Sequence, residues 1–187
     1  MSEKSIKAQQ KSCAHQVDQE IQKMIERTLV LIKPDGVERG LIGECLMRFE
    51  RAGFKIVGMR MVWTNKEHAM KHYTEDITKR RGEKVRKALL EYVTSGPIVA
   101  MVIEGIDAIE NIRKIVGPTE PKSAPPGTIR GDFAHISFAY AEKNQPGLKN
   151  LIHASGNKQD AEHEVSLWFS DDELHAYSTV HDKHIKE

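Results

Sequence analysis

Apolar residues in this chain fall into short runs that favour strands and longer stretches with helical spacing. The segments 28–32, 54–63 and 98–103 are rich in β-branched and other apolar residues, as strands are. The third segment is apolar at every position, which is typical of a central strand covered on both faces. The segment 133–138 resembles these runs and is the predicted fourth strand. One face of the second strand is predicted to carry Val57, Met59, Met61 and Trp63.

Helical spacing of apolar residues follows each of the first three predicted strands. The pattern predicts helices over 41–49 and 109–116. Between the second and third strands it predicts a pair of helices, one that begins after Thr64 and one over 85–93. Pro and Gly are concentrated in 117–131, which predicts a long loop before the fourth strand.

The order of these elements is βαβ, a helical pair, then βαβ. Two βαβ units that share one sheet predict an α+β, ferredoxin-like fold with an antiparallel four-stranded sheet and the helical pair inserted between strands two and three. Residues 26–187 form the predicted domain. Residues 1–25 are rich in Lys, Gln and Ser and carry one short helical stripe of apolar residues. We therefore expect an N-terminal extension that is partly helical or mobile.

The composition is that of an ordinary globular protein. The 187 residues include 28 Lys plus Arg and 27 Asp plus Glu, and this balance argues against a protein that binds nucleic acid over its whole surface. Two cysteines rule out a disulfide framework. No apolar run reaches the roughly 20 residues needed to span a bilayer, so we expect no membrane partner. The N-terminus lacks the apolar stretch of a signal peptide, which predicts a cytoplasmic protein.

One basic cluster is the only feature that favours nucleic acid. Charge runs of this kind are usually solvated helix faces, and the total charge is close to zero, so we do not expect a nucleic-acid partner. The cluster consists of Lys79, Arg80, Arg81, Lys84, Arg86 and Lys87.

Glycine-rich nucleotide-binding motifs are absent from the sequence. Neither G-x-x-x-x-G-K-[ST] nor G-x-G-x-x-G occurs, so side chains would have to hold any phosphates. Lys33 follows the first strand, Arg113 lies in the helix before the long loop, and Arg130 lies near the end of that loop. Converging Lys and Arg side chains make a clamp for phosphoryl oxygens, although each by itself is more often a surface charge or an ion-pair partner.

Histidines supply the candidate acid, base or nucleophile. His153 follows an apolar pair, and Glu164 lies in a helix-like stretch that can bring a carboxylate back to the ring. Such a carboxylate fixes the tautomer and leaves the other ring nitrogen as a nucleophile, but the spacing also suits a satisfied core histidine. His68 and His72 have a helical spacing that can bind a metal. Because no third ligand is evident, we interpret this pair as solvated helix surface.

Several blocks of sequence carry a resemblance to a known family. They read RTLVLIKPDG at 27–36, PGTIRGDF at 126–133, NLIHAS at 150–155 and SLWF at 166–169. Through these blocks the chain resembles nucleoside diphosphate kinase over about residues 26–177. The resemblance implies a ferredoxin-like core with an added helical pair, in agreement with the pattern above. It also implies an enzyme that transfers the γ-phosphoryl of ATP to a nucleoside diphosphate by a ping-pong mechanism.

The resemblance further implies roles for individual residues. His153 would carry the phosphoryl group as a phosphohistidine, Glu164 would hold its ring, and Ser155 would support both. Lys33 would reach the sugar hydroxyl and the transferred phosphoryl. Mg²⁺ would bridge the β- and γ-phosphates as a cofactor with little direct protein coordination. The implied nucleotide-binding residues are Lys33, Tyr73, Val85, Arg113, Thr119, Arg130 and Asn150.

The chain departs from the family pattern at several positions. Val85 stands where the family has a phenylalanine that stacks on the base, and 138–149 contains an insertion. Ala154 and Gly156 replace a glycine and an acidic residue. We expect weaker nucleotide binding with unchanged chemistry. The departures also motivate an alternative, a family-like protein that binds nucleotide but acts as a regulatory or interaction module with little catalytic activity.

The resemblance also predicts the partners of the chain. They are ATP and other nucleoside di- and triphosphates, together with further copies of the chain itself. Family members assemble as hexamers, or as tetramers in some bacteria, so we expect a homo-oligomer and favour a hexamer.

Overall fold

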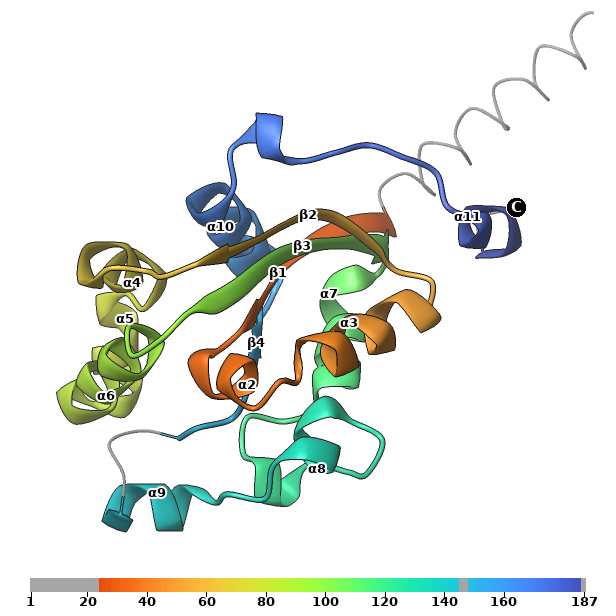
Figure 1. Cartoon of the computed structure of the whole chain (residues 1–187). Coiled ribbons are helices and arrows are strands. Elements are labelled where there is room, and N and C mark those ends of the chain that lie inside the picture. Colours follow the sequence, from red (N-terminus) through yellow and green to blue (C-terminus); the bar gives the residue numbers. More distant parts are fainter. Residues whose placement is uncertain (1–23, 145–147, 186–187) are drawn as a thin grey trace, which may run out of the picture.

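The strands of the computed structural model form one antiparallel sheet (Figure 1). The structure describes residues 24–144 and 148–185. The strand order is β2-β3-β1-β4, so the two strands of each βαβ unit are separated by a strand of the other unit. This topology confirms the predicted ferredoxin-like α+β fold. The strands are β1 (Ile25–Ile32), β2 (Lys55–Val62), β3 (Ile98–Ile106) and β4 (Ile152–Ala154).

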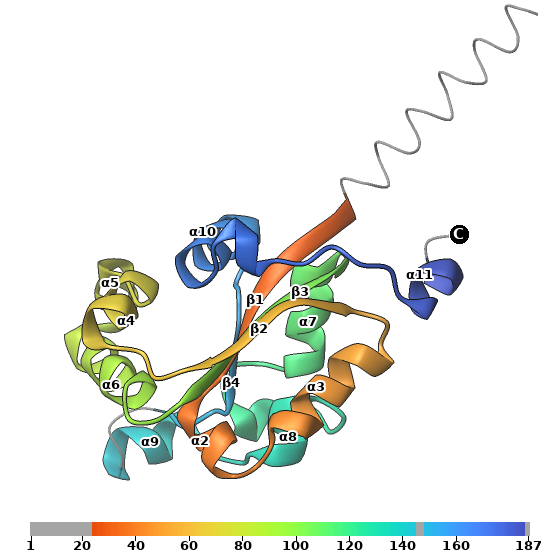
Figure 2. The ribbon, with the colours of Figure 1, turned by 45° about the horizontal axis from the view of Figure 1, so that its top comes forward.

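Helices connect the strands and cover both faces of the sheet (Figures 1 and 2). Three helices, rather than the predicted pair, lie between β2 and β3. The additional helix, α5, buries none of its residues, so its sequence carries no apolar stripe that could reveal it. The α-helices are α2 (Pro34–Glu38), α3 (Ile42–Arg51), α4 (Lys66–His72), α5 (Glu75–Arg81), α6 (Glu83–Val93), α7 (Ala108–Val116), α8 (Ile129–Phe133), α9 (Phe138–Asn144), α10 (Lys158–Trp168) and α11 (Val180–Ile185), and the short 3₁₀ helices are η1 (Pro121–Ser123) and η2 (Asp171–Glu173).

The core consists of two apolar clusters, one on each face of the sheet. Val30 and Ile32 of β1 join one cluster with residues of α3, α7 and α8. Leu29 and Leu31 join the other cluster with residues of α4, α6 and α10. Because successive side chains of a strand point to opposite faces, a strand between two clusters must be apolar throughout. This explains the continuous apolar run of the first predicted strand.

The fourth strand does not lie where the sequence predicted it. The segment 133–138 instead holds the end of α8 and the start of α9. Thr128 caps α8, because its side chain accepts a hydrogen bond from the backbone N–H of Gly131, and this favours a helical turn. The actual strand, β4, has three residues and is too short to show an alternating pattern.

A register shift in β2 separates residues that the sequence placed on one face. The pairing of β2 with β3 shifts between Ile56 and Gly58, and a bulge of this kind reverses the alternation of side chains. Val57 is consequently buried, whereas the apolar residues beyond the bulge are on the surface. These exposed residues are Met59, Met61 and Trp63, at 54%, 58% and 70% exposure.

The predicted N-terminal extension, residues 1–25, lies largely outside the described residues. Its last residue, Ile25, begins β1 rather than belonging to a helical stripe. In the described part of the chain, no helix has both the length and the apolar character needed to cross a membrane.

Candidate active site

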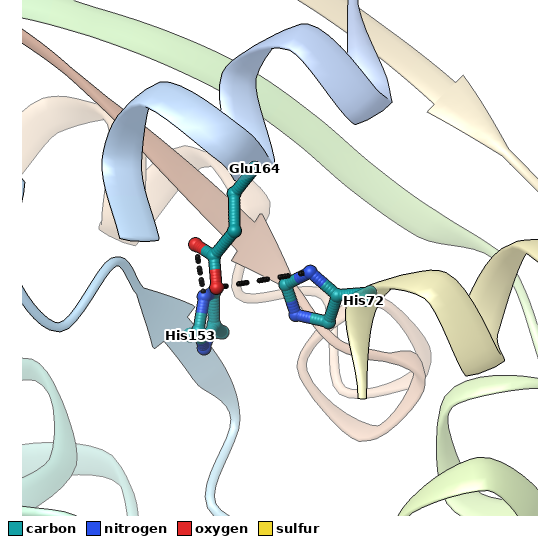
Figure 3. A group of neighbouring side chains, drawn as sticks. All are labelled: His72, His153 and Glu164. Carbon is teal, nitrogen blue, oxygen red and sulfur yellow. Dashed lines mark hydrogen bonds and ion pairs between the residues drawn. The ribbon is translucent and has the colours of Figure 1, made fainter. Parts of the chain in front are cut away.

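His153 and Glu164 form the pair that the sequence predicted (Figure 3). His153 lies on β4, and its Nε2 is 2.8 Å from Oε2 of Glu164 in α10. The Ser155 hydroxyl donates to the same carboxylate oxygen at 2.6 Å and accepts from the backbone N–H of Leu29 at 3.2 Å. The carboxylate is therefore anchored to the central strand β1. The His153 side chain is 20% exposed, so the ring reaches the surface, unlike a core histidine.

The charge on Glu164 determines which nitrogen of His153 carries the proton. Burial alone would raise the pKa of Glu164, but the charge of His153 and hydrogen bonds from His153 and Ser155 lower it to about 2. A carboxylate can only accept hydrogen bonds, so the proton between the two groups belongs to Nε2 of His153. Nδ1 then keeps its lone pair and is the nitrogen that can act as a nucleophile.

The turn after β1 holds the segment that leads into His153. The Lys33 N–H donates to the Leu151 carbonyl at 2.8 Å, and the Asp35 carboxylate accepts from the Leu151 N–H at 3.3 Å. Leu151 has a φ of +67°, a backbone conformation that residues other than glycine rarely adopt. The buried Tyr92 hydroxyl donates to the other oxygen of Asp35. Asp35 was not among the residues that the sequence predicted for the site.

Arg130 is buried and fixes the strand that carries His153. Its guanidinium donates to the carbonyl oxygens of Gly117 at 2.7 Å and Ile152 at 2.5 Å, and to that of Asn150 at 3.3 Å. Burial and the neighbouring charge of Arg113 lower the pKa of Arg130 to about 10, so this group stays charged at neutral pH. A guanidinium has five N–H donors, so donors remain for anionic oxygens.

Lys33 and Asn150 form a second buried pair. The Lys33 ammonium donates to the Asn150 amide oxygen at 2.8 Å, and the Asn150 amide nitrogen donates to the Thr119 carbonyl at 2.8 Å. Burial, with the charge of Arg130, lowers the pKa of Lys33 to about 7, and Asp35 only partly opposes this. Lys33 is therefore a cation whose charge depends on what else occupies the site.

Tyr73 lies at the end of α4 and is buried at the same site. Its hydroxyl has no hydrogen-bond partner in the structure. Burial raises its pKa, and the charge of Glu164 raises it further while that of Arg130 lowers it. Buried hydroxyls normally have a partner, so this one is available to a ligand oxygen.

His72 corrects the interpretation of the histidine pair on α4 as solvated surface. Only 7% of His72 is exposed, and its ring packs edge-on against His153 at 4.7 Å between centroids (Figure 3). The Trp168 indole N–H donates to Nδ1 of His72 at 3.3 Å. Burial lowers the pKa of His72 to about 3, so the ring is neutral beside His153 and Glu164.

Three predicted nucleotide-binding residues lie on the surface. Arg113 is exposed in the last turn of α7, close enough to Arg130 to affect the pKa of that residue. Thr119 is exposed, while its carbonyl holds Asn150. Val85 lies in the first turn of α6 and is 38% exposed. Its aliphatic side chain takes no part in the hydrogen-bond network that joins the others.

The side chains at the site do not form a cage of oxygen ligands for a metal. Among the described residues, one group of His, Cys, Asp or Glu side chains is close enough to hold an ion, and it consists of His72, His153 and Glu164. Two ring nitrogens do not suit Mg²⁺, which prefers oxygen ligands. The carboxylate of Glu164 is also already bound to Ser155 and His153. These residues therefore fit a Mg²⁺ ion that is held by nucleotide phosphates and not by the protein.

Comparisons with known proteins identify the family. The model of the family described as nucleoside diphosphate kinase matches residues 26–174. A nucleoside diphosphate kinase of Pyrococcus abyssi is 52% identical over 158 residues, which cover 84% of this chain and 92% of the relative. A solved transition-state mimic of nucleoside-diphosphate kinase from Borrelia burgdorferi, with bound vanadate and ADP, has a TM-score of 0.84 and 43% identity and covers 86% of this chain and 96% of its own. A halophilic nucleoside diphosphate kinase from Halobacterium salinarum, in complex with CDP, has a TM-score of 0.74 and 38% identity and covers 87% of this chain and 99% of its own. The chain therefore belongs to the nucleoside diphosphate kinase family.

Proposed function

We propose that this nucleoside diphosphate kinase transfers the γ-phosphoryl of ATP to nucleoside diphosphates through a phosphohistidine at His153. The observation that carries the proposal is the 2.8 Å contact between Nε2 of His153 and Glu164, because it leaves Nδ1 unprotonated on a ring that reaches the surface. The alternative, a regulatory or interaction module with little activity, is not favoured by relatives that are named as this enzyme.

The transfer takes place in two half-reactions at one site. In the first, the lone pair of His153 Nδ1 attacks the γ-phosphorus, and the bond from that phosphorus to the β–γ bridging oxygen breaks. The electron pair leaves with ADP, and Glu164 stabilises the positive charge on the ring. In the second, a terminal phosphate oxygen of the acceptor diphosphate attacks the same phosphorus. The N–P bond then breaks and its electron pair returns to Nδ1.

The remaining residues hold the nucleotide in place for this transfer. The residues that contact the phosphates are Arg113, Thr119, Tyr73 and Arg130. Lys33 contacts the sugar and the transferred phosphoryl, and Asn150 contacts the sugar. Val85 lies next to the base of the nucleotide. Because most of these contacts are to phosphate and sugar, the edges of the base are not read, and all common nucleotides are accepted. The supporting observation is the buried cluster of donors that surrounds His153, with the unpaired Tyr73 hydroxyl among them.

The divalent cation in this proposal is Mg²⁺, which would be held by the nucleotide and not by protein side chains. When bound, it neutralises the charge that develops on the transferred phosphoryl group. Arg130 is a buried cation at the site, and Lys33 becomes a second one when the phosphates favour its charged form, so these two residues supply the positive charge of the protein.

The test of the proposal is a phosphorylated intermediate. Incubation of the full chain with ATP and Mg²⁺ is expected to leave one acid-labile, base-stable phosphate on each chain, at His153. Addition of GDP to the isolated phosphoprotein should release that phosphate as GTP. A protein that binds ATP but retains no phosphate, or that retains it on another residue, would overturn the proposal.

Nucleotide binding is expected to take up a proton at Lys33. At pH 8 a group with a pKa of about 7 is mostly neutral, and an arriving phosphate favours its charged form. ADP should therefore bind with a larger uptake of protons at pH 8 than at pH 6, and its affinity should fall as the pH rises above 7. Calorimetric titration in buffers of different ionisation enthalpy measures this uptake. In Lys33→Met the uptake at pH 8 should disappear, and equal uptake in both proteins would contradict the prediction.

We also propose that residues 26–187 form a catalytic domain that acts in the cytoplasm as a homo-oligomer, either a hexamer or a tetramer. The exposed apolar residues Met59, Met61 and Trp63 support assembly, because they follow one another along and just beyond the edge strand β2. An exposed apolar row on a sheet edge usually marks a contact surface. A monomer mass from light scattering would exclude an oligomer.

A further inference from the structure

The insertion at 138–149 begins with an aromatic residue that lies close to the helices around Val85. Phe138 is the first residue of α9 and is 37% exposed. The guanidinium of Arg81, the last residue of α5, lies over its ring at 5.6 Å from the centroid. Val85 follows Arg81 by four residues, in the first turn of α6. Figure 2 shows α9 next to α6, and the contact between Arg81 and Phe138 joins α9 to the end of α5.

A chain of contacts connects Phe138 to the proposed sugar site. The Phe138 N–H donates to the Glu120 carboxylate at 2.8 Å. Thr119 precedes Glu120, and its carbonyl oxygen accepts a hydrogen bond from the Asn150 amide nitrogen at 2.8 Å. Asn150 in turn accepts from Lys33 at 2.8 Å. The start of α9 is therefore fixed to the same segment that fixes Asn150, and Arg81 connects it to the helices that carry Val85.

We propose that Phe138, with Arg81 against its ring, is the stacking surface for the base of the bound nucleotide. This inference rests on the proposed function, which places the sugar at Lys33 and Asn150. A flat aromatic ring with a guanidinium beside it suits a heteroaromatic base, whereas an aliphatic valine offers no π-face. Stacking of this kind tolerates every base, and the larger purines gain more from it than pyrimidines do. The insertion thus supplies the aromatic contact that position 85 lacks.

The experiment compares Phe138→Ala with a matched variant on the same helix. Tyr140→Ala removes an exposed aromatic that lies two residues further on and therefore about 200° around the helix axis. Phe138→Ala should raise the KM for ADP and GDP on the order of tenfold and act on KM rather than on kcat. Tyr140→Ala should leave KM unchanged, and Phe138→Tyr should restore it.

A substrate without a base distinguishes stacking from a structural effect. The KM for a ribosyl diphosphate that lacks the base should be the same in wild type and in Phe138→Ala. An equal rise for base-free and base-containing substrates, an equal effect of Tyr140→Ala, or no rise at all would overturn the inference. If the wild type exchanged no phosphate, the proposed function would fail. The stacking inference would then still be decided by the affinities of the two variants for ADP, measured by calorimetry.

Discussion

Replacement of His153 by alanine is expected to abolish phosphate exchange between ATP and GDP. The side chain provides the only proposed nucleophile, and its Nδ1 is kept unprotonated by the contact of Nε2 with Glu164. Removal of a covalent nucleophile leaves only binding and electrostatic contributions, so kcat should fall by at least about 10³-fold. The acid-labile phosphate should vanish as well, which phosphate analysis after incubation with labelled ATP measures directly.

The matched control is His163→Ala. His163 is exposed on α10, one residue before Glu164, so its loss changes a histidine of the same helix without touching the catalytic pair. This variant should exchange phosphate at the wild-type rate. ADP affinity should also survive in His153→Ala, because Arg130, Lys33 and Asn150 remain. Phosphate that persists on His153→Ala would mean that another residue is the nucleophile.

Replacement of Glu164 by glutamine is expected to have the second largest effect. The carboxylate accepts a hydrogen bond from the Nε2–H of His153, whereas an amide in the same place can donate a hydrogen bond to that nitrogen. The imidazole would then carry its proton on Nδ1, which removes the nucleophilic lone pair. An Asp→Asn change in a serine-protease triad, which imposes the wrong tautomer in the same way, reduces kcat by about 10⁴-fold. We expect a loss of roughly 10²- to 10⁴-fold in the rate of phosphohistidine formation, measured by rapid quench.

Ser155→Ala provides the comparison for this effect. It removes one hydrogen bond to the same carboxylate oxygen but leaves the charge and the tautomer in place. Its rate of phosphohistidine formation should fall by no more than about tenfold, since one hydrogen bond contributes on the order of 1 kcal/mol. Equal losses in the two variants would show that Glu164 acts only by holding the ring and not by setting its tautomer.

Much of the fold could be predicted because apolar periodicity reflects burial. The first and third strands lie between two clusters and are continuously apolar over 29–32 and 98–103, and the stripes of α3, α6 and α7 face the sheet. Elements without such burial could not be predicted in this way. Helix α5 buries no residue and therefore carries no apolar stripe, and β4 has three residues, too few for an alternation to be detected. The segment 133–138 joins the end of α8 to the start of α9, and its alternation of apolar and polar residues resembles that of a strand.

The site could be predicted where residue type determines the chemistry. His153, Glu164 and Ser155 lie together as the sequence indicated, because a carboxylate on the following helix can return to a ring on the short strand. His72 could not be assigned from its spacing, since a histidine pair on a helix is usually solvated. Asp35 was also missed, because its role depends on the Leu151 N–H, which is 116 positions away in the chain.

The placement of His153 on β4 affects how the enzyme would lose activity on heating. This strand has three residues, lies at the edge of the sheet and pairs only with β1. Side-chain hydrogen bonds with Arg130 and Asp35 also hold the segment in place. Ile152 and Ala154 of this strand belong to the apolar cluster that contains residues of α3, α7 and α8, so the strand cannot open without exposing part of that core. Loss of the contact between His153 and Glu164 on heating is therefore expected to accompany disruption of the core on that face of the sheet, and inactivation should coincide with denaturation.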